Sequence, residues 1–207
     1  MKSGAVDPYC FPGTNVLRNL RGILDRSELE RFESLAASLA GQALYRNPPP
    51  IMDLNYLKSI HRTLFGQIYP WAGETRRNLG RMTKTRTNGS VVRYGDSAFV
   101  DAELDRMLNL LATEKYLQGL SLDQFSVRAG FFYGELDAIH PFREGNSRTL
   151  RLFFHGLAHN AGFRLAWNAL LATENARNTL YAARDRAVMH GDSSHLAALF
   201  HSLLSPR

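Results

Sequence analysis

Residues 140–148, with the sequence HPFREGNSR, join two apolar helical patterns with no long linker between them. The first pattern fills 121–139 and is halted by Pro141, and the second runs on toward Gly162, a typical helix stop. HPFREGNSR is therefore predicted to be a loop that leads into a helix N-terminus. The apolar residues at helical spacing are Phe125, Ala129, Phe132, Leu136 and Ile139 before the segment, and Leu150, Phe153, Phe154, Leu157, Ala158 and Ala161 after it.

Helical patterns also occupy 25–44, 53–65, 96–116, 174–188 and 193–204. Expected N-caps are Asp53 for the second of these and Asp192 or Ser193 for the last. Residues 1–15 contain two Pro and two Gly without periodicity, which predicts an extended N-terminal arm. The fold expected is mainly α, one domain over 1–207, with helices surrounding a central helix. The apolar face predicted for 25–44 consists of Leu29, Phe32, Leu35, Ala36 and Leu39.

The segment from Thr75 to Tyr94 loses helical periodicity. Asn88-Gly89 is a strong signal for a two-residue hairpin turn, and 90–94 could follow it as a strand. A short exposed hairpin over about 75–94 is the prediction. Whether its charges contact a partner or are only solvated stays open at this point. These charges are Arg76, Arg77, Arg81, Lys84, Arg86 and Arg93.

Composition excludes some classes of protein. The chain has 207 residues, a formal net charge of +6 and one cysteine, Cys10, so it has no disulfide within the chain. No Cys/His spacing resembles a zinc site, and no apolar run has the length of a signal peptide or a membrane span. A basic surface could meet nucleic acid, but no helix-turn-helix or stacking motif accompanies it, so direct nucleic-acid binding is not expected. A soluble intracellular protein is expected.

The HPFREGNSR segment contains the groups needed for attack on a phosphate. Free N–H groups at a helix start favour an anion, and Gly145 lets the backbone approach it closely. Arg148 and Arg151, three residues apart, could bind two phosphates. Glu144 could hold Mg²⁺ against those phosphates, and His140 could take a proton from a hydroxyl. Each residue alone has a plainer reading: His140 as a hydrogen-bonding helix end, Glu144 as a surface acid.

The segment resembles the motif of the Fic family, His-x-Phe-x-(Asp/Glu)-Gly-Asn-(Gly/Lys)-Arg, usually followed by a second arginine three residues on. Only Ser147 departs from it. Residues 60–65 with 69–73 resemble the family's segment before its flap, and 134–139 its run into the motif. The closest resemblance is to bacterial Fic toxins and to the Fic domains of secreted effectors. The matching positions are His140, Phe142, Glu144, Gly145, Asn146, Arg148 and Arg151.

The resemblance implies a helical fold with a β-hairpin flap, the cofactors ATP and Mg²⁺, and AMP transfer to a Ser, Thr or Tyr hydroxyl of a target protein. By position, His140 is the base, Glu144 the metal ligand and Arg151 the ligand of the terminal phosphate. The anion hole is formed by Gly145, Asn146, Ser147 and Arg148. Tyr181 is a candidate adenine contact. Target docking by strand addition is assigned to Thr75, Asn78, Thr83, Val91 and Val92.

Two further expectations follow from the resemblance. A positive torsion at Ser147 would cost a non-glycine residue energy, so reduced activity, nucleotide binding without transfer, or a different transfer chemistry are alternatives. None of the nine Glu has Ser or Thr four residues before it, so the family's internal restraint is expected to come instead from a small antitoxin whose Glu reaches Arg151. The runner-up is an unrestrained effector domain. The expected targets are DNA gyrase and topoisomerase IV subunits, in the cytoplasm or in a cell that receives an injected effector.

Overall fold

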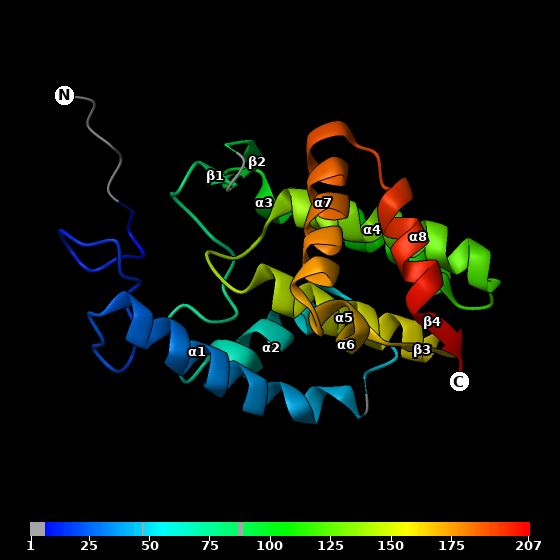
Figure 1. Ribbon diagram of the computed structural model, residues 1–207, viewed down its shortest axis with the longest axis horizontal. Coiled ribbons are helices and arrows are strands. Elements are labelled where there is room, and N and C mark those ends of the chain that lie inside the picture. Colours follow the sequence, from blue (N-terminus) through cyan, green and yellow to red (C-terminus); the bar gives the residue numbers. More distant parts are fainter. Residues whose placement is uncertain (1–6, 47, 87–88) are drawn as a thin grey trace.

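A computed structural model describes residues 7–46, 48–86 and 89–207. Within them the chain is mainly α-helical (Figure 1), as expected. The helices are α1 (Arg26–Gly41), α2 (Leu54–Phe65), α3 (Val100–Thr113), α4 (Leu122–Ile139), α5 (Asn146–Asn160), α6 (Trp167–Leu171), α7 (Glu174–His190) and α8 (Ser194–Leu203), with 3₁₀ turns η1 (Gln42–Tyr45) and η2 (Lys115–Leu117). The strands are β1 (Arg81–Thr85), β2 (Val91–Asp96), β3 (Phe163–Leu165) and β4 (Leu204–Pro206).

Helix α4 lies at the centre of one half of the molecule. Ser121 and Gln124 form a capping box at its start, so two otherwise unpaired N–H groups are satisfied. Gly130 and Gly134 leave a flat strip on which α8 and α7 pack closely, and a Cβ built at Gly130 would lie 2.6 Å from the backbone nitrogen of Ala197. In Figure 1, α7 runs across both α4 and α5.

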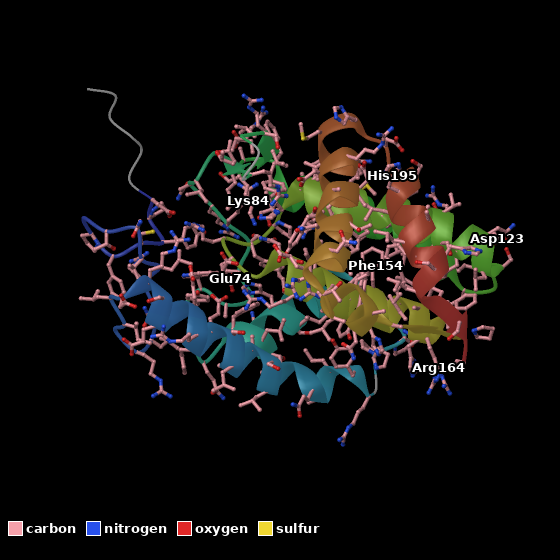
Figure 2. All side chains as sticks on the ribbon, viewed as in Figure 1. Glu74, Lys84, Asp123, Phe154, Arg164 and His195 are labelled. Carbon is pink, nitrogen blue, oxygen red and sulfur yellow. The ribbon has the colours of Figure 1, made fainter. Side chains whose placement is uncertain are left out.

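Helix α5 shares the core with α4 and joins it to α2. Phe153, Phe154 and Leu157 are fully buried. Phe154, labelled in Figure 2, packs against Tyr133 of α4 and Phe200 of α8, with ring centroids 5.1 and 5.5 Å away. The motif helix is thus held by apolar packing, and this packing fixes where its N-terminus lies.

The predicted apolar face of α1 is partly wrong. Leu29 is buried, and Phe32 and Ala36 are partly buried, but Leu35 and Leu39 are 64% and 61% exposed. The buried row of α1 is Leu29, Glu33, Ala37 and Gly41. These positions recur every four residues, and the last two, Ala37 and Gly41, are small, so this end of α1 approaches α2 closely, and a Cβ at Gly41 would lie 3.3 Å from Leu64.

The hairpin is present as antiparallel β1 and β2, with an irregular register between Arg81 and Thr83. Asn88 of the predicted turn lies outside the described residues. Residues 75–80 form a lead-in loop, and Asp96 ends β2, so α3 begins later than predicted. Helix α6 and the pair β3–β4 were not foreseen, because such short elements show no periodicity.

The N-terminal segment that the structure describes is not an extended arm. Residues 7–15 form turns, and Cys10 pairs with Leu17 in an isolated bridge. Tyr9 packs edge-on against Trp71, and Asp7 forms an ion pair with Arg143 at 2.7 Å. The segment therefore folds back onto the loop that carries the motif. No helix among the described residues combines the length and apolarity needed to cross a bilayer.

Candidate active site

The HPFREGNSR segment lines one pocket of about 580 Å³ at the start of α5. The flap closes one side of this pocket and α7 another. The pocket contains all of the residues predicted for the phosphate site, together with several that were not predicted, such as Arg184. The lining includes His140, Glu144, Gly145, Asn146, Ser147, Arg148, Arg151, Tyr181 and Arg184, and Met82, Thr83, Lys84 and Arg86 from the flap.

The backbone of the loop depends on Gly145. Its φ is +82°, and a Cβ there would lie 2.3 Å from the Phe65 ring. The Asn146 side chain bonds both the N–H and the carbonyl of Phe142, at 2.8 and 2.7 Å. The side chain of Asn146 is therefore used to close the loop. An anion at this position would bind the N-terminal N–H groups of α5 instead.

The torsional strain considered for Ser147 is absent. Ser147 lies in the first turn of α5 and is not among the described residues with positive φ. The positive torsions of this segment fall on Gly145 and on His140, whose φ is +52°. The Ser147 Oγ accepts hydrogen bonds from Arg151 at 2.9 Å and from Arg184 at 3.2 Å. Its hydroxyl therefore joins two guanidinium groups at the rim of the anion site.

The two motif arginines have different surroundings. Arg148 forms an ion pair with Glu33 of α1, lies 3.5 Å from Glu144, and stacks over Phe65. Among the described residues, Arg151 has no carboxylate within ion-pairing distance, and burial lowers the pKa of its guanidinium. A partly buried arginine without a counter-charge favours an anion from outside the chain.

Glu144 is the candidate metal ligand. Its side chain is 43% exposed in the pocket, and its Oε1 accepts the N–H of Gly145 at 2.9 Å. No cluster of three or more His, Cys, Asp or Glu suited to a metal occurs among the described residues. One carboxylate facing a phosphate site fits Mg²⁺, which takes its other ligands from phosphate and water.

His140 is the C-cap of α4 and adopts a left-handed conformation. Arg76, fully buried, donates to the carbonyls of His140 at 2.7 Å, of Ile139 at 3.1 Å and of Gly80 at 2.8 Å. Tyr94 of β2 stacks on the imidazole with centroids 3.8 Å apart. These contacts hold the histidine in a conformation that a non-glycine residue adopts only at a cost.

His61 of α2 contacts the HPFREGNSR loop at Phe142 and Glu144. Its Nδ1 accepts the N–H of Gly73 at 2.8 Å, so its Nε2 donates to the carbonyl of Glu144 at 3.0 Å. The ring stacks on Phe142 with centroids 3.9 Å apart. Burial lowers the pKa of His61 to about 4, so the ring is neutral at pH 7.

Tyr181 of α7 lies at the mouth of the pocket and is 39% exposed. The guanidinium carbons of Arg86 and Arg184 lie 5.8 and 5.9 Å from its ring centroid. Arg86, at the end of β1, forms an ion pair with Asp185 of α7. The flap is thereby tied to α7 beside the position predicted to contact adenine.

The residues predicted for target docking fall into two groups. Thr75 is buried and donates to Asp101 at 2.7 Å, and Val92 is also buried, so neither side chain lies on a surface that a target could contact. Thr83, Asn78 and Val91 are exposed. In the described sheet β1 pairs only with β2, so the outer edge of β1 has no strand beside it.

A profile of the Fic/DOC family matches residues 51–158, more than half of the chain. The chain belongs to the Fic/DOC family. This Fic chain is 37% identical to protein adenylyltransferase VbhT of Bartonella schoenbuchensis over 203 residues, which are 98% of the chain and 40% of VbhT. It is 32% identical over 199 residues to the Fic protein of Salmonella typhimurium, also named as an adenylyltransferase, and covers 92% of it.

Solved structures agree. The Fic chain matches the BepC effector of Bartonella tribocorum, solved with AMPPNP, at a TM-score of 0.82 and 26% identity, covering 96% of this chain and 97% of that one. It matches the Fic domain of a Bartonella quintana effector, solved with ADP, at a TM-score of 0.82 and 27% identity, covering 96% and 95%. The expected family and fold are therefore confirmed. The Fic chain spans less than half of the length of VbhT.

Several residues around the site were not singled out from the sequence. Asp137 precedes His140 by three positions on one helix, a spacing that places both on one face and could have been noticed. Glu33, His61 and Arg184 come from elements far away in the chain, and no local pattern marks them. Arg76 was named among the charges of the predicted exposed hairpin, but the structure buries it.

Proposed function

We propose that this Fic chain transfers AMP from ATP to a hydroxyl side chain of a target protein. The observation that carries the proposal is the pocket at the start of α5, where His140, Glu144 and Arg151, which has no carboxylate partner among the described residues, face one volume. The names of its relatives and the nucleotides in the two Bartonella structures support a nucleotide site.

In the proposed reaction the target hydroxyl gives its proton to a ring nitrogen of His140. The hydroxyl oxygen attacks the α-phosphorus of ATP, a new P–O bond forms, and the bond to the bridging oxygen breaks, so pyrophosphate leaves. The α5 N-terminus and Arg148 stabilise charge on the phosphates. Arg151 binds a phosphate beyond the α-position.

Glu144 would hold Mg²⁺, which neutralises phosphate charge when bound. Its half-exposed carboxylate, turned toward the same pocket, fits this role. The adenine would lie toward Tyr181. The target segment would add to the free edge of β1 near Thr83, with Asn78 and Val91 on the exposed flap.

The reaction is tested by incubating the chain with ATP labelled on the α-phosphate, Mg²⁺ and bacterial lysate. We expect labelled protein with the parent chain and none with His140→Ala. A parallel sample with γ-labelled ATP separates AMP transfer from phosphate transfer, because AMP transfer leaves no γ-label on protein. Equal α-label with His140→Ala would overturn the mechanism, and nucleotide binding with no label at all would favour a binding module.

We also propose that a small antitoxin restrains the chain by bringing a Glu to Arg151. A groove of about 540 Å³ runs between α1, α5 and α6, and Arg148 and Arg151 line both this groove and the nucleotide pocket. A partner helix in the groove could therefore reach Arg151. Purification of the chain from cells that carry its native gene neighbourhood tests this: we expect a small protein to co-purify, and Arg151→Ala to weaken that co-purification. An injected effector domain should bring no such partner.

The proposed targets are the subunits of DNA gyrase and topoisomerase IV. They follow from the resemblance to bacterial Fic toxins and not from any residue of the pocket. Purified subunits incubated with the chain and α-labelled ATP provide the test. Intact mass should rise by one AMP on the modified subunit, and unchanged mass in each subunit would remove these targets.

A further inference from the structure

The inner edge of His140 is buried and unsatisfied. Its Nδ1 is closed off from solvent and has no hydrogen-bond partner among the described residues. The nearest carboxylate oxygen is Oδ1 of Asp137, 3.8 Å away. This distance is too long for a hydrogen bond, but such bonds in ligand-free active sites are often long and shorten in the complex.

The backbone directs the imidazole toward Asp137. Asp137 lies one turn before His140, which caps α4 in a left-handed conformation, and in this arrangement Nδ1 of His140 lies 3.8 Å from Oδ1 of Asp137. Arg76 fixes the His140 carbonyl and Tyr94 covers the ring face. With the carbonyl and one ring face held, Nδ1 is left facing the buried carboxylate, while the ring lines the nucleotide pocket.

Arg184 of α7 holds Asp137 ionised. Its Nε and Nη2 bond the two carboxylate oxygens at 2.9 and 2.6 Å, and both side chains are buried. Burial by itself would raise the pKa of Asp137, but the Arg184 charge outweighs it and lowers the pKa below its ordinary value. The remaining nitrogen, Nη1, donates to Ser147 in the first turn of α5.

We propose that Asp137 is the positioning residue of His140, and that Arg184 links this pair to the phosphate site through Ser147. An ionised Asp137 accepts a hydrogen bond from Nδ1–H, so the lone pair of His140 is on Nε2. Once Nε2 takes the hydroxyl proton, the same carboxylate stabilises the positive ring. The assignment rests on the proposed function for His140 as base.

The tautomer of His140 can be measured without an activity assay. ¹⁵N-labelled full chain is studied by two-dimensional NMR of the histidine rings at neutral pH, with His140 assigned by comparison with His140→Ala. We expect the proton on Nδ1 in the parent and on Nε2 in Asp137→Asn, whose amide turns an N–H toward the ring. A proton on Nε2 in the parent would overturn the proposal. This readout is independent of whether AMP transfer occurs.

Kinetics provide the second arm. Asp137→Asn should lower kcat on the order of 100-fold, the range of a general base, while KM for ATP changes less than about threefold. Because this variant leaves Arg184 buried and unpaired, the double variant Asp137→Leu/Arg184→Met is made as well; it removes both charges and restores stability. We expect its kcat to remain low. Recovery of parental kcat in the double variant would show a merely structural pair.

The matched control is Glu114→Leu/Arg128→Met. Arg128 is also on α4 and forms a similar two-point ion pair with Glu114, but neither residue lines the nucleotide pocket. This control should keep the parental kcat and the parental His140 tautomer. An equal loss of kcat in this control would show that removing any ion pair of α4 lowers the rate, and would contradict a specific role for Asp137.

Discussion

At the scale of single residues, the site depends on the backbone conformations of a few positions. Gly145 takes the positive torsion next to Phe65, His140 takes a second one under the clamp of Arg76, and Ser147 takes none. The departure from the family's usual glycine at Ser147 is therefore compatible with the helix, and its hydroxyl adds contacts to Arg151 and Arg184.

Ser147→Gly should not activate the chain. No strain is relieved, and glycine in a helix costs about 1 kcal/mol relative to Ala. We expect a lower melting temperature and AMP transfer no higher than that of the parent. Ser147→Ala is the control, since it removes the hydroxyl and keeps helix propensity. Activation of several fold by Gly but not by Ala would contradict this view of Ser147.

His61 should make stability depend on pH. Its pKa is about 4 in the folded chain against 6.5 in the unfolded one, so between these values the unfolded state binds more protons. The free energy of unfolding should therefore fall as pH drops from 6.5 to 4, by about 3 kcal/mol from this group. Urea titrations of the parent and of His61→Gln at several pH values measure it.

The His61→Gln curve should be flatter over that window. His195→Gln, which changes an exposed histidine, should follow the parent (Figure 2). Parallel curves for the parent and His61→Gln would show that the buried ring is not kept neutral by the fold.

At the scale of elements, the position of the HPFREGNSR segment follows from how closely helices approach α4. Glycines at 130 and 134 let α8 and α7 come near, and α7 then brings Arg184 to Asp137 and Tyr181 to the pocket mouth. The flap is also tied to α7, through the ion pair between Arg86 and Asp185. Packing of α4 therefore determines where the groups of the site lie.

Gly130→Ala should separate α4 from α8. The added Cβ would lie 2.6 Å from a backbone atom of α8, which cannot give way as a flexible side chain does. We expect a loss of about 1–3 kcal/mol in the free energy of unfolding, typical of overpacking, despite the better helix propensity of Ala. Chemical denaturation is the measurement. Val127→Ala, at an exposed position of α4, is the control and should change stability little.

At the scale of the whole molecule, the pocket is built from distant parts of the chain. Glu33 comes from α1, His61 from α2, Arg86 from the flap and Arg184 from α7. The folded N-terminal segment adds Asp7 against Arg143. Under the proposed function, nucleotide binds only when these parts are assembled, so binding and global stability should be linked.

ATP with Mg²⁺ should raise the melting temperature of the parent. At a ligand concentration 100 times the dissociation constant the gain is about 2.7 kcal/mol. Arg151→Met should lose most of this gain, because Arg151 has no carboxylate partner among the described residues and the phosphates would supply its counter-charge. Arg164→Met, at the exposed position of β3, is the control and should keep the full shift (Figure 2). A full shift in Arg151→Met would place the phosphates elsewhere.

The sequence by itself determined the helical class, the hairpin and the motif. Local rules decide these features: apolar spacing marks α4 and α5, Ser121 and Asp53 cap their helices, and HPFREGNSR is contiguous. The prediction from apolar spacing was wrong about the buried face of α1. There the close approach to α2 at Ala37 and Gly41 decides which face is buried, and Leu35 and Leu39 stay exposed.

Only the tertiary structure decided the surroundings of the motif. It brought Arg184 to Asp137 and Ser147, Glu33 to Arg148 and Arg76 to the end of α4. These partners are separated by tens of residues, so no spacing along the chain reveals them. The physical reason is that ion pairs and hydrogen bonds act over a few ångströms in space, and packing of the helices determines which side chains come that close.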